Sequence, residues 1–420
     1  MRPRVAVVGT GVAGLTCTHV LRHDFDVTVF EAAPRPGGHT NTVSIALPEG
    51  EFPVDTGFIV YNEPGYPGLV RLLAELDVVT KPSDMSFSVA DEATGLEYRG
   101  TSFSTVFAQR RNLARPAFLR MLGEVARFNR LAHRLLDEDP GPDYTLRDML
   151  DEGRWSSAFV DWYLVPLGSS IWSADPTTFT DMPASTLARF FDRHGLLSIG
   201  DKPDWRTVAG GARHYVDAIL APVIAEGRLR LSSPVLAVRR SHDGVELRCE
   251  GSERWEEFDH LVLATHSDEA LAVLQDPSPE EKEVLSAICF QPNSAVLHTD
   301  RSFLPRQQRA WASWNFHRRA DQGDRATLTY YMNFLQGIPS ATPVLLTLNQ
   351  DDVIDPGSVV ATFDYAHPVM NAAAVDAQGR HHEVSGVNKV SYAGAYWGYG
   401  FHEDGVQSAL RVCEGLGVTW

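Results

Sequence analysis

A glycine-rich turn near the N-terminus constrains the fold more than any other stretch of this chain. Residues 5–8 form an apolar run with β-branched side chains, which is typical of a parallel strand buried on both faces. The sequence Gly9-Thr-Gly11-Val-Ala-Gly14 follows, and residues 15–22 are predicted to be helical. Gly9 permits the tight turn, Gly11 lets a ligand approach the backbone, and Gly14 lets the helix lie close to the strand. The turn therefore predicts a site for the pyrophosphate of a dinucleotide at a helix N-terminus.

The next strand supports this interpretation. Residues 26–30 form a second apolar strand that ends in Glu31, which lies 31 − 9 = 22 residues after the first glycine. An acidic residue at this distance is the usual hydrogen-bond partner of a ribose hydroxyl. The alternative is a glycine-rich turn without a ligand, which the surrounding strands and helix disfavour. The residues predicted to bind the dinucleotide here are Gly9, Gly11, Val12, Ala13, Gly14, Glu31 and Ala32.

Length and charge exclude several classes of protein. A chain of 420 residues exceeds one ordinary core, so more than one domain is expected. The net charge of −17 argues against a nucleic-acid partner. The four cysteines are scattered, and no spacing of ligands predicts a metal site. Because no signal segment or long apolar run is present, we expect a cytoplasmic protein. Nothing in the sequence indicates an oligomeric state.

Two further segments carry a resemblance to a known family. Arg35-Pro-Gly37-Gly38 follows the ribose acid, and Val54-Asp55-Thr56-Gly57 comes next. The order and spacing of these motifs resemble those of the flavin-dependent amine oxidase and desaturase superfamily. That superfamily usually continues the double glycine with arginine, whereas this chain has His39. The resemblance implies bound FAD, and it adds these predicted cofactor residues: Gly37, Gly38, His39, Thr56, Gly57 and Phe58.

The same resemblance implies the fold. It is an α/β fold (α+β overall), with a Rossmann-like FAD-binding domain and a discontinuous substrate domain that contains a mixed or antiparallel sheet and helices. The predicted FAD-binding domain comprises 1–80, 206–272 and 386–420, and the predicted substrate domain comprises 81–205 and 273–385. Cofactor contacts are also expected from the later segments, at Val235, Ala264, Gly394, Asp404, Gly405 and Val406. The last three begin a helix whose N–H groups would face the flavin.

Candidate catalytic residues lie near the C-terminus. His402 occupies the place where amine oxidases have an aromatic side chain that faces the flavin, and His367, after Tyr365, lies in the segment that supplies the opposite wall. An imidazole could act as a base near neutral pH, or both histidines could be packing residues. Glu403 could orient His402 or serve a helix N-terminus. Trp397 could line the cavity or belong to the core.

A narrower resemblance concerns the substrate. The segments Asp84-Met-Ser-Phe-Ser-Val89 and Gly398-Tyr-Gly-Phe-His-Glu-Asp-Gly405 look like those of FAD-dependent oxidoreductases related to the N-terminal part of plant cyclopropane fatty-acid synthases. This resemblance implies hydride transfer to flavin N5 from an apolar substrate, a lipid acyl chain. Oxidation of a small amine and a non-catalytic lipid-binding module are the alternatives. Residues 290–300 lack the lysine that many amine oxidases have there.

Residues 107–136 form an arginine-rich amphipathic stretch. Seven arginines stand against Glu124, a net charge of +6. An ordinary surface helix is one interpretation, and peripheral contact with an anionic membrane is the other. The aromatic stretch 155–173 could likewise line a substrate cavity or form core.

Overall fold

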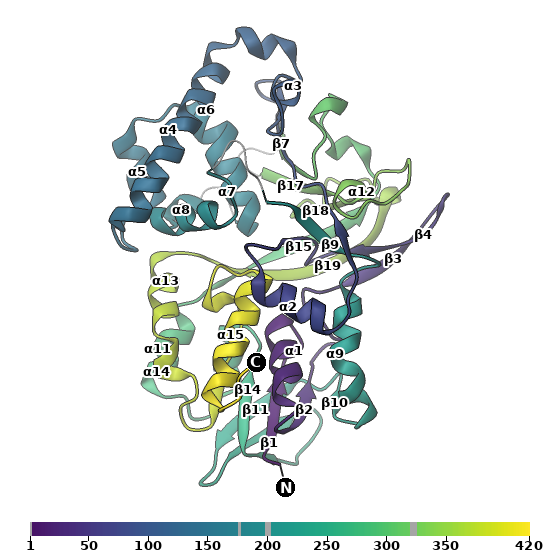
Figure 1. Ribbon diagram of the computed structural model, residues 1–420, viewed down its shortest axis with the longest axis vertical. Coiled ribbons are helices and arrows are strands. Elements are labelled where there is room, and N and C mark those ends of the chain that lie inside the picture. The colour runs from purple at the N-terminus through teal and green to yellow at the C-terminus, as the bar shows by residue number, and fades with distance from the viewer. Residues whose placement is uncertain (1, 175–177, 198–202, 320–325) are drawn as a thin grey trace.

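The computed structural model describes residues 2–174, 178–197, 203–319 and 326–420. Figure 1 shows two bodies stacked along the long axis of the molecule. The lower body contains the N-terminal strand and helices α1 (Val12–Leu21), α9 (Arg213–Ala225) and α15 (His402–Gly415). The upper body contains the large sheet and the helices between α3 (Phe103–Val106) and α8 (Ala184–Arg193).

A parallel sheet forms the centre of the lower body. Its strand order is β10 (Leu229–Arg230), β2 (Asp26–Phe30), β1 (Arg4–Val8), β14 (His260–Leu263) and β20 (Val390–Tyr392). Val5 and Val7 pack against α1, α9 and α15, whereas Ala6 and Val8 face the opposite layer. Because side chains alternate along a strand, an unbroken apolar run is what a sheet covered on both faces requires.

The opposite layer is built from a small meander and several helices. The meander comprises β11 (Val235–Arg240), β12 (Val245–Cys249) and β13 (Glu256–Phe258). The helices of this layer and its rim are α10 (Ser267–Val273), α11 (Pro279–Ser286), α13 (Ala372–Gly379) and α14 (His381–Val384). Side chains of α11 and α13 share one core with this sheet, although the predicted division places 273–385 in the substrate domain.

A seven-stranded mixed sheet forms the floor of the upper body. Its order is β19 (Val359–Pro368), β15 (Phe290–His298), β18 (Leu345–Leu348), β17 (Ala326–Tyr331), β16 (Trp314–Arg318), β7 (Phe87–Asp91) and β8 (Leu96–Arg99). All neighbours are antiparallel except β16 and β7, which run parallel. The pairing brings residues 87–99 beside a segment more than 200 residues later in the chain, which no local pattern indicates.

Helices cover one end of this sheet. They are α4 (Pro116–Glu138), α5 (Leu146–Gly153), α6 (Ser157–Phe159), α7 (Val165–Trp172) and α8, which share one core cluster. The predicted helical stretch over 107–136, which Pro116 was expected to be able to divide, consists of a 3-10 turn, η1 (Arg110–Ala114), and α4. Pro116 begins α4 because a proline, which lacks an N–H, is tolerated in the first turn.

Shorter elements join the two bodies. They are the hairpin of β3 (Thr42–Leu47) and β4 (Gly50–Asp55), the sheet of β5 (Tyr61–Asn62), β9 (Trp205–Val208) and β6 (Thr80–Pro82), and the helices α2 (Pro67–Glu75) and α12 (Met332–Leu335). Among the described residues, no helix combines the length and the apolar character needed to cross a bilayer.

Candidate active site

A cavity of about 1630 Å³ extends from the parallel sheet to the helices of the upper body. Val8, Glu31 and Leu263 line it where three neighbouring parallel strands end. This position, at the carboxyl ends of the strands, is where open α/β sheets bind their ligands. Because a pocket for one small molecule measures about 300–1,000 Å³, this cavity has room for a cofactor and a substrate together.

The glycine-rich turn forms one wall of the cavity. A Cβ on Gly9 would lie 2.7 Å from the carbonyl oxygen of Ala264, and a Cβ on Gly14 would lie 2.0 Å from that of Gly9. At Gly11, by contrast, a Cβ would meet no atom within 4 Å. The N-terminus of α1 has no side-chain cap, and Val12 and Ala13 line the cavity. The open space at Gly11 and the uncapped helix start fit a bound pyrophosphate.

The double glycine closes over this turn. The Gly37 N–H donates to Thr10 Oγ1 over 3.0 Å, and a Cβ on Gly38 would lie 3.1 Å from the Cα of Gly11. Thr10 in turn donates to the Glu31 carboxylate through its N–H at 2.9 Å and its hydroxyl at 2.5 Å. Glu31 is thereby held at the end of β2, beside the cavity. The two predicted motifs thus form one structural unit at the end of the cavity where the sequence predicts the adenosine and pyrophosphate of FAD.

His402 begins α15 and lies in the middle of the cavity wall. Its ring stacks on Phe58, with the ring centroids 3.7 Å apart. Its Nε2 lies 3.0 Å from Thr40 Oγ1 and 3.1 Å from the hydroxyl of Tyr215, and these two oxygens are 2.5 Å apart. Burial lowers the pKa of His402 to about 3, so the imidazole is neutral at physiological pH.

A second aromatic wall contains two more histidines. The ring of His39 stacks on Tyr365 at 4.8 Å and lies 5.3 Å from the ring of His367. Asn293 Nδ2 donates to His367 Nδ1 over 2.8 Å, which places the His367 proton on Nε2. The Tyr365 hydroxyl is 2.9 Å from Thr56 Oγ1. These contacts join the segment Asp55-Thr56-Gly57 to β19, which comes about 300 residues later in the chain.

All of these imidazoles are kept uncharged. Burial, reinforced by His266, lowers the pKa of His367 to about 4. Burial also lowers the pKa of His39 well below its ordinary value, with further contributions from His367 and His266. His39 Nε2 is buried and has no hydrogen-bond partner among the described residues. An orphaned ring nitrogen at the cavity fits a polar atom of a bound flavin, in the place where the family usually has arginine.

Most residues predicted from the sequence line the cavity. They are Gly9, Gly11, Val12, Ala13, Glu31, Ala32, Gly38, His39, Gly57, Phe58, Val235, Ala264, Tyr365, His367, Gly394 and His402. The other predicted residues lie behind this lining: Gly14, Gly37, Thr56, Trp397, Glu403, Asp404, Gly405 and Val406.

Four residues of α15 and its preceding loop have structural contacts. Both carboxylate oxygens of Glu403 accept backbone N–H groups of the first turn of α2, and none of its hydrogen bonds reaches His402. Asp404 accepts the N–H of Phe401, and its burial raises its pKa to about 6. A Cβ on Gly405 would lie 2.6 Å from Val12 Cγ1, so α15 packs tightly on α1. Trp397 packs in the core of the lower body, in edge contact with His381.

The rest of the cavity has a different character, and we call it the apolar end. Side chains of α3, α4, α7, α8, β9 and the strands β7, β8, β16 and β17 of the mixed sheet line it, together with Met85 and Tyr163 from the segments before β7 and α7. The lining residues are Met85, Phe87, Tyr98, Phe103, Val106, Met121, Leu122, Val125, Tyr163, Leu167, Ile171, Trp172, Phe190, Trp205, Trp314 and Tyr330. The stretch 155–173 serves both predicted purposes, since Tyr163 and Ile171 line the cavity and Phe159 is fully buried in the helical core. The α4 lining was not recognised from sequence, although Leu122 and Val125 are three residues apart and so lie on one helix face.

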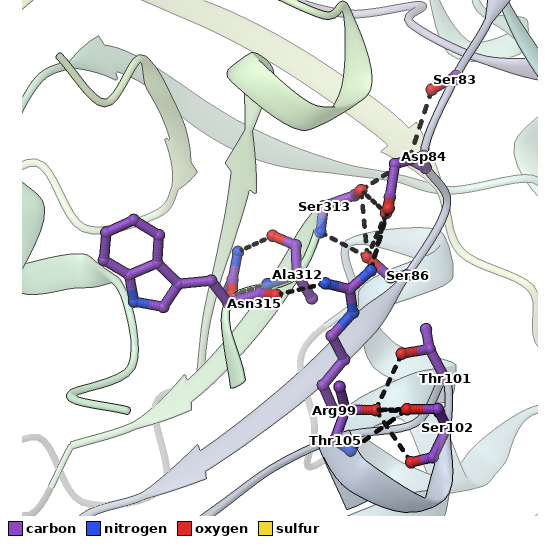
Figure 2. Close-up of polar contacts among 11 residues, drawn as sticks. Ser83, Asp84, Ser86, Arg99, Thr101, Ser102, Thr105, Ala312, Ser313 and Asn315 are labelled. Atoms are coloured by element: carbon purple, nitrogen blue, oxygen red, sulfur yellow. Dashed lines mark hydrogen bonds and ion pairs between the residues drawn. The ribbon is translucent and has the colours of Figure 1, made fainter. Parts of the chain in front are cut away.

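The segment 84–89 supports the apolar end rather than reacting within it. Figure 2 shows Asp84, Ser86, Arg99 and Ser313 gathered into one polar cluster. Asp84 pairs with Arg99 at 3.0 Å and accepts the hydroxyls of Ser86 at 2.5 Å and Ser313 at 2.8 Å. These contacts join the start of β7 to the loop before β16, and they place Met85 on the cavity.

Comparison with known proteins identifies the family of this chain and solved structures that share its fold. The family model of flavin containing amine oxidoreductases matches residues 12–348. Cyclohexylamine oxidase from Brevibacterium oxydans IH-35A has a TM-score of 0.70 and 16% identity, covering 99% of this chain and 100% of that chain. The CLA-producing fatty acid isomerase from P. acnes has a TM-score of 0.70 and 14% identity, covering 98% of both chains. At these identities the solved structures show a shared fold.

Proposed function

Because this chain belongs to the flavin-containing amine oxidoreductase family, and is thereby an FAD-dependent oxidoreductase, we propose that its substrate is the acyl chain of a lipid. Bound FAD supplies a hydride acceptor at N5. The family allows substrates of very different polarity, so the choice among them depends on the lining of the cavity. The resemblance to the proteins related to plant cyclopropane fatty-acid synthases supports the same class of substrate.

The absence of charge at the apolar end carries the proposal. No aspartate, glutamate, lysine or arginine lines this end among the described residues. His194, which follows α8 and lines the cavity beside this end, is neutral because burial lowers its pKa to about 4. An unpaired ammonium group in such a site would lose its hydration without gaining a counter-ion, which is costly. A hydrocarbon chain has no charge whose hydration could be lost there, and it gains contact with aromatic and aliphatic side chains.

Acidic side chains elsewhere on the cavity do not change this conclusion. Glu31 is held by Thr10 at the nucleotide end, and Asp268 and Glu269 belong to the first turn of α10 beside the parallel sheet. Asp364 is exposed on β19, an edge strand. Strand β19 contributes none of the side chains that form the apolar end, and the other three carboxylates lie at the nucleotide end of the cavity.

The protein's own residues would orient the acyl chain of the substrate and exclude water from the cavity. Forming a carbon–carbon double bond removes a hydride from one carbon and a proton from its neighbour. The neutral imidazole of His402 could accept that proton. His367 could do so only by giving up its bond from Asn293, because its Nε2 carries a proton and its Nδ1 accepts the Asn293 amide. Thr40 and Tyr215 hold His402 by its Nε2, and Asn293 holds His367 by its Nδ1, so neither ring is free to rotate.

Anaerobic mixing of the FAD-loaded protein with defined lipids tests the proposal. We expect phospholipids or free fatty acids to bleach the flavin absorbance, and mass spectrometry to find a product with two hydrogens fewer. Bleaching by cyclohexylamine or putrescine, without a response to any lipid, would instead support oxidation of an amine. Stable FAD binding without reduction by lipid or amine would indicate a lipid-binding module.

A matched pair of variants on α4 tests the apolar end itself. Val125 lines the cavity, and its neighbour Ala126 is exposed. We expect Val125→Asn to slow lipid-dependent bleaching by about tenfold, because a buried amide without a partner costs about 1–3 kcal/mol. Ala126→Asn should leave the rate unchanged, and both variants should bind FAD normally. Equal rates in the two variants would show that the acyl chain does not lie along α4.

A further inference from the structure

One end of the molecule combines arginines with exposed apolar side chains. Figure 1 places α3 and α4 in the upper body, at the end opposite the N-terminus. Phe103 is 70% exposed, Leu113 is 46% exposed and Leu119 is 44% exposed. They are three of the nine large hydrophobic side chains that stand out as exposed among the described residues, and they lie within 17 residues of sequence. We call this surface the arginine-rich end; its exposed arginines are Arg110, Arg111, Arg120, Arg127, Arg130 and Arg134.

The two acidic residues of this region point inward. Between residues 93 and 136, all of which the structure describes, Glu97 and Glu124 are the only carboxylates, and both are buried. Glu97 accepts the N–H groups of Arg306 and Gln307, and Glu124 accepts the N–H and hydroxyl of Ser156. The exposed surface of this segment is therefore purely basic, in a chain whose net charge is −17.

Neighbouring elements strengthen this asymmetry. The short 3-10 turn η5 (Gln308–Ala310) contacts α3, and both its own Arg309 and the nearby Arg306 are exposed. Not every arginine here is free for a partner. Arg115 packs over Trp162 and Arg127 packs over Trp155, with the guanidinium carbons 4.7 and 3.6 Å from the ring centroids. Arg120 pairs with Glu124 at 3.3 Å, and the Arg111 guanidinium donates to the carbonyl oxygen of Gly95. Those four side chains contribute to the fold as well as to the surface charge.

The cavity reaches the surface beside this patch. Thr101, Ser102 and Phe103 are exposed and also line the cavity. Helix α4 contributes Leu122 and Val125 to the cavity from one face and exposes Arg120, Arg127 and Arg130 on the other. A single helix thus separates the apolar interior from the arginine-rich surface.

We propose that the arginine-rich end rests on a bilayer of anionic phospholipids, with Phe103, Leu113 and Leu119 inserted at the interface. Arginines attract the negative lipid surface, and exposed apolar side chains gain burial among the acyl chains. The mouth of the cavity then opens at the membrane, so that an acyl chain enters without crossing water. This route of entry rests on the proposed lipid substrate, whereas the docking itself does not.

Sedimentation of the FAD-loaded protein with vesicles tests the docking. We expect binding to phosphatidylcholine vesicles that contain phosphatidylglycerol, weaker binding in high salt, and little binding to phosphatidylcholine alone. The variant Arg110→Gln/Arg130→Gln/Arg134→Gln should lower the partition coefficient by about 100-fold, since each arginine near the surface contributes roughly fivefold. The control Arg2→Gln/Arg239→Gln/Arg254→Gln removes the same charge from the lower body and should bind like wild type.

A second variant separates insertion from attraction. Leu113→Gln/Leu119→Gln keeps every charge and should still lose about tenfold in partition, because two apolar contacts are removed. Normal FAD binding and an unchanged unfolding temperature establish that both variants are folded. The proposal would be overturned if wild-type protein did not bind anionic vesicles. It would also be overturned if the arginine variant and its control lost the same fraction of their vesicle partition coefficient. Binding to polyglutamate but not to vesicles would assign the surface to an acidic protein and overturn it as well.

The proposed substrate can fail independently of the docking. If detergent-dispersed lipid bleaches the flavin but vesicles do not bind, the lipid substrate stands and the membrane surface is wrong. If vesicles bind but no lipid form bleaches the flavin, the surface stands and the lipid substrate is wrong.

Discussion

Replacing Glu403 by glutamine should destabilise the fold rather than slow the chemistry. Glu403 is 2% exposed, and its carboxylate oxygens accept the N–H groups of Gly68 and Leu69 over 3.0 Å each. Gln407 donates to the same carboxylate over 2.8 Å. The side chain thus caps α2 from α15, and its negative charge lies at the positive end of the α2 dipole.

The magnitude follows from these contacts. A hydrogen bond to a charged group contributes about 1.5–3 kcal/mol, and a glutamine would weaken one bond and set its amide against the other N–H. The expected loss is about 3–4 kcal/mol. With about 2.1 cal/mol/K per residue, unfolding of 420 residues has an entropy near 0.9 kcal/mol/K, so Tm should fall by about 4 °C.

Thermal unfolding and the rate of flavin reduction together decide the role of Glu403. The control Glu414→Gln changes an exposed glutamate of the same helix and should shift Tm by less than about 1 °C. An unchanged Tm in Glu403→Gln with a slower reduction rate would refute the capping argument. That result would instead support the sequence-based hypothesis that Glu403 orients His402.

Three further predictions concern the cofactor site and its pH dependence. Gly14→Ala should prevent folding, because its Cβ would lie 2.0 Å from a backbone oxygen. Gly11→Ala should fold with an unchanged Tm and bind FAD at least tenfold more weakly. Circular dichroism measures the folding of the two variants, and FAD titration measures their affinity for the cofactor. Thr10→Val should cost about 1–2 kcal/mol in urea unfolding, because it removes the hydroxyl that donates to Glu31, and an unchanged midpoint would contradict this. The pKa of His402 is about 3 in the folded protein and about 6.5 when unfolded, so the unfolded state binds more protons between these values and stability falls as pH falls. His402→Gln should therefore lose about 1.4 kcal/mol less per pH unit than wild type between pH 6.5 and 5, measured by urea unfolding; parallel slopes would show that the ring is protonated in the fold.

Local patterns were sufficient for the nucleotide end of the site. The turn from Gly9 to Gly14 and the acid at Glu31 belong to one strand–helix–strand unit, whose geometry depends on neighbours in sequence. The steric limit at Gly14 is set by the carbonyl oxygen of Gly9 within the same turn, whereas the limit at Gly9 is set by Ala264, which follows β14. The existence of a second, mixed sheet was also predicted, since alternating apolar residues and turns mark its strands.

The contacts of individual side chains were harder to predict. Glu403 follows directly after His402 in sequence, yet a helix turns by about 100° per residue, so the two side chains face different elements. Trp397 lies among cavity residues in the sequence, but it packs against His381 in the core. Residue type alone could not separate a cavity aromatic from a core aromatic, because both are buried.

The sequence by itself determined that this chain would fold around a dinucleotide, and its motif order indicated FAD. Those features depend on short-range backbone geometry, which glycine and β-branched residues encode directly. Only the tertiary structure decided which side chains face the reacting end, because β19 and the start of α15 bring Tyr365 and His402 to one cavity from distant segments, and α9 supplies the Tyr215 hydroxyl that contacts His402. It also decided that one face of α4 lines an uncharged cavity while the other carries arginines, since burial of a helix face depends on the elements packed against it.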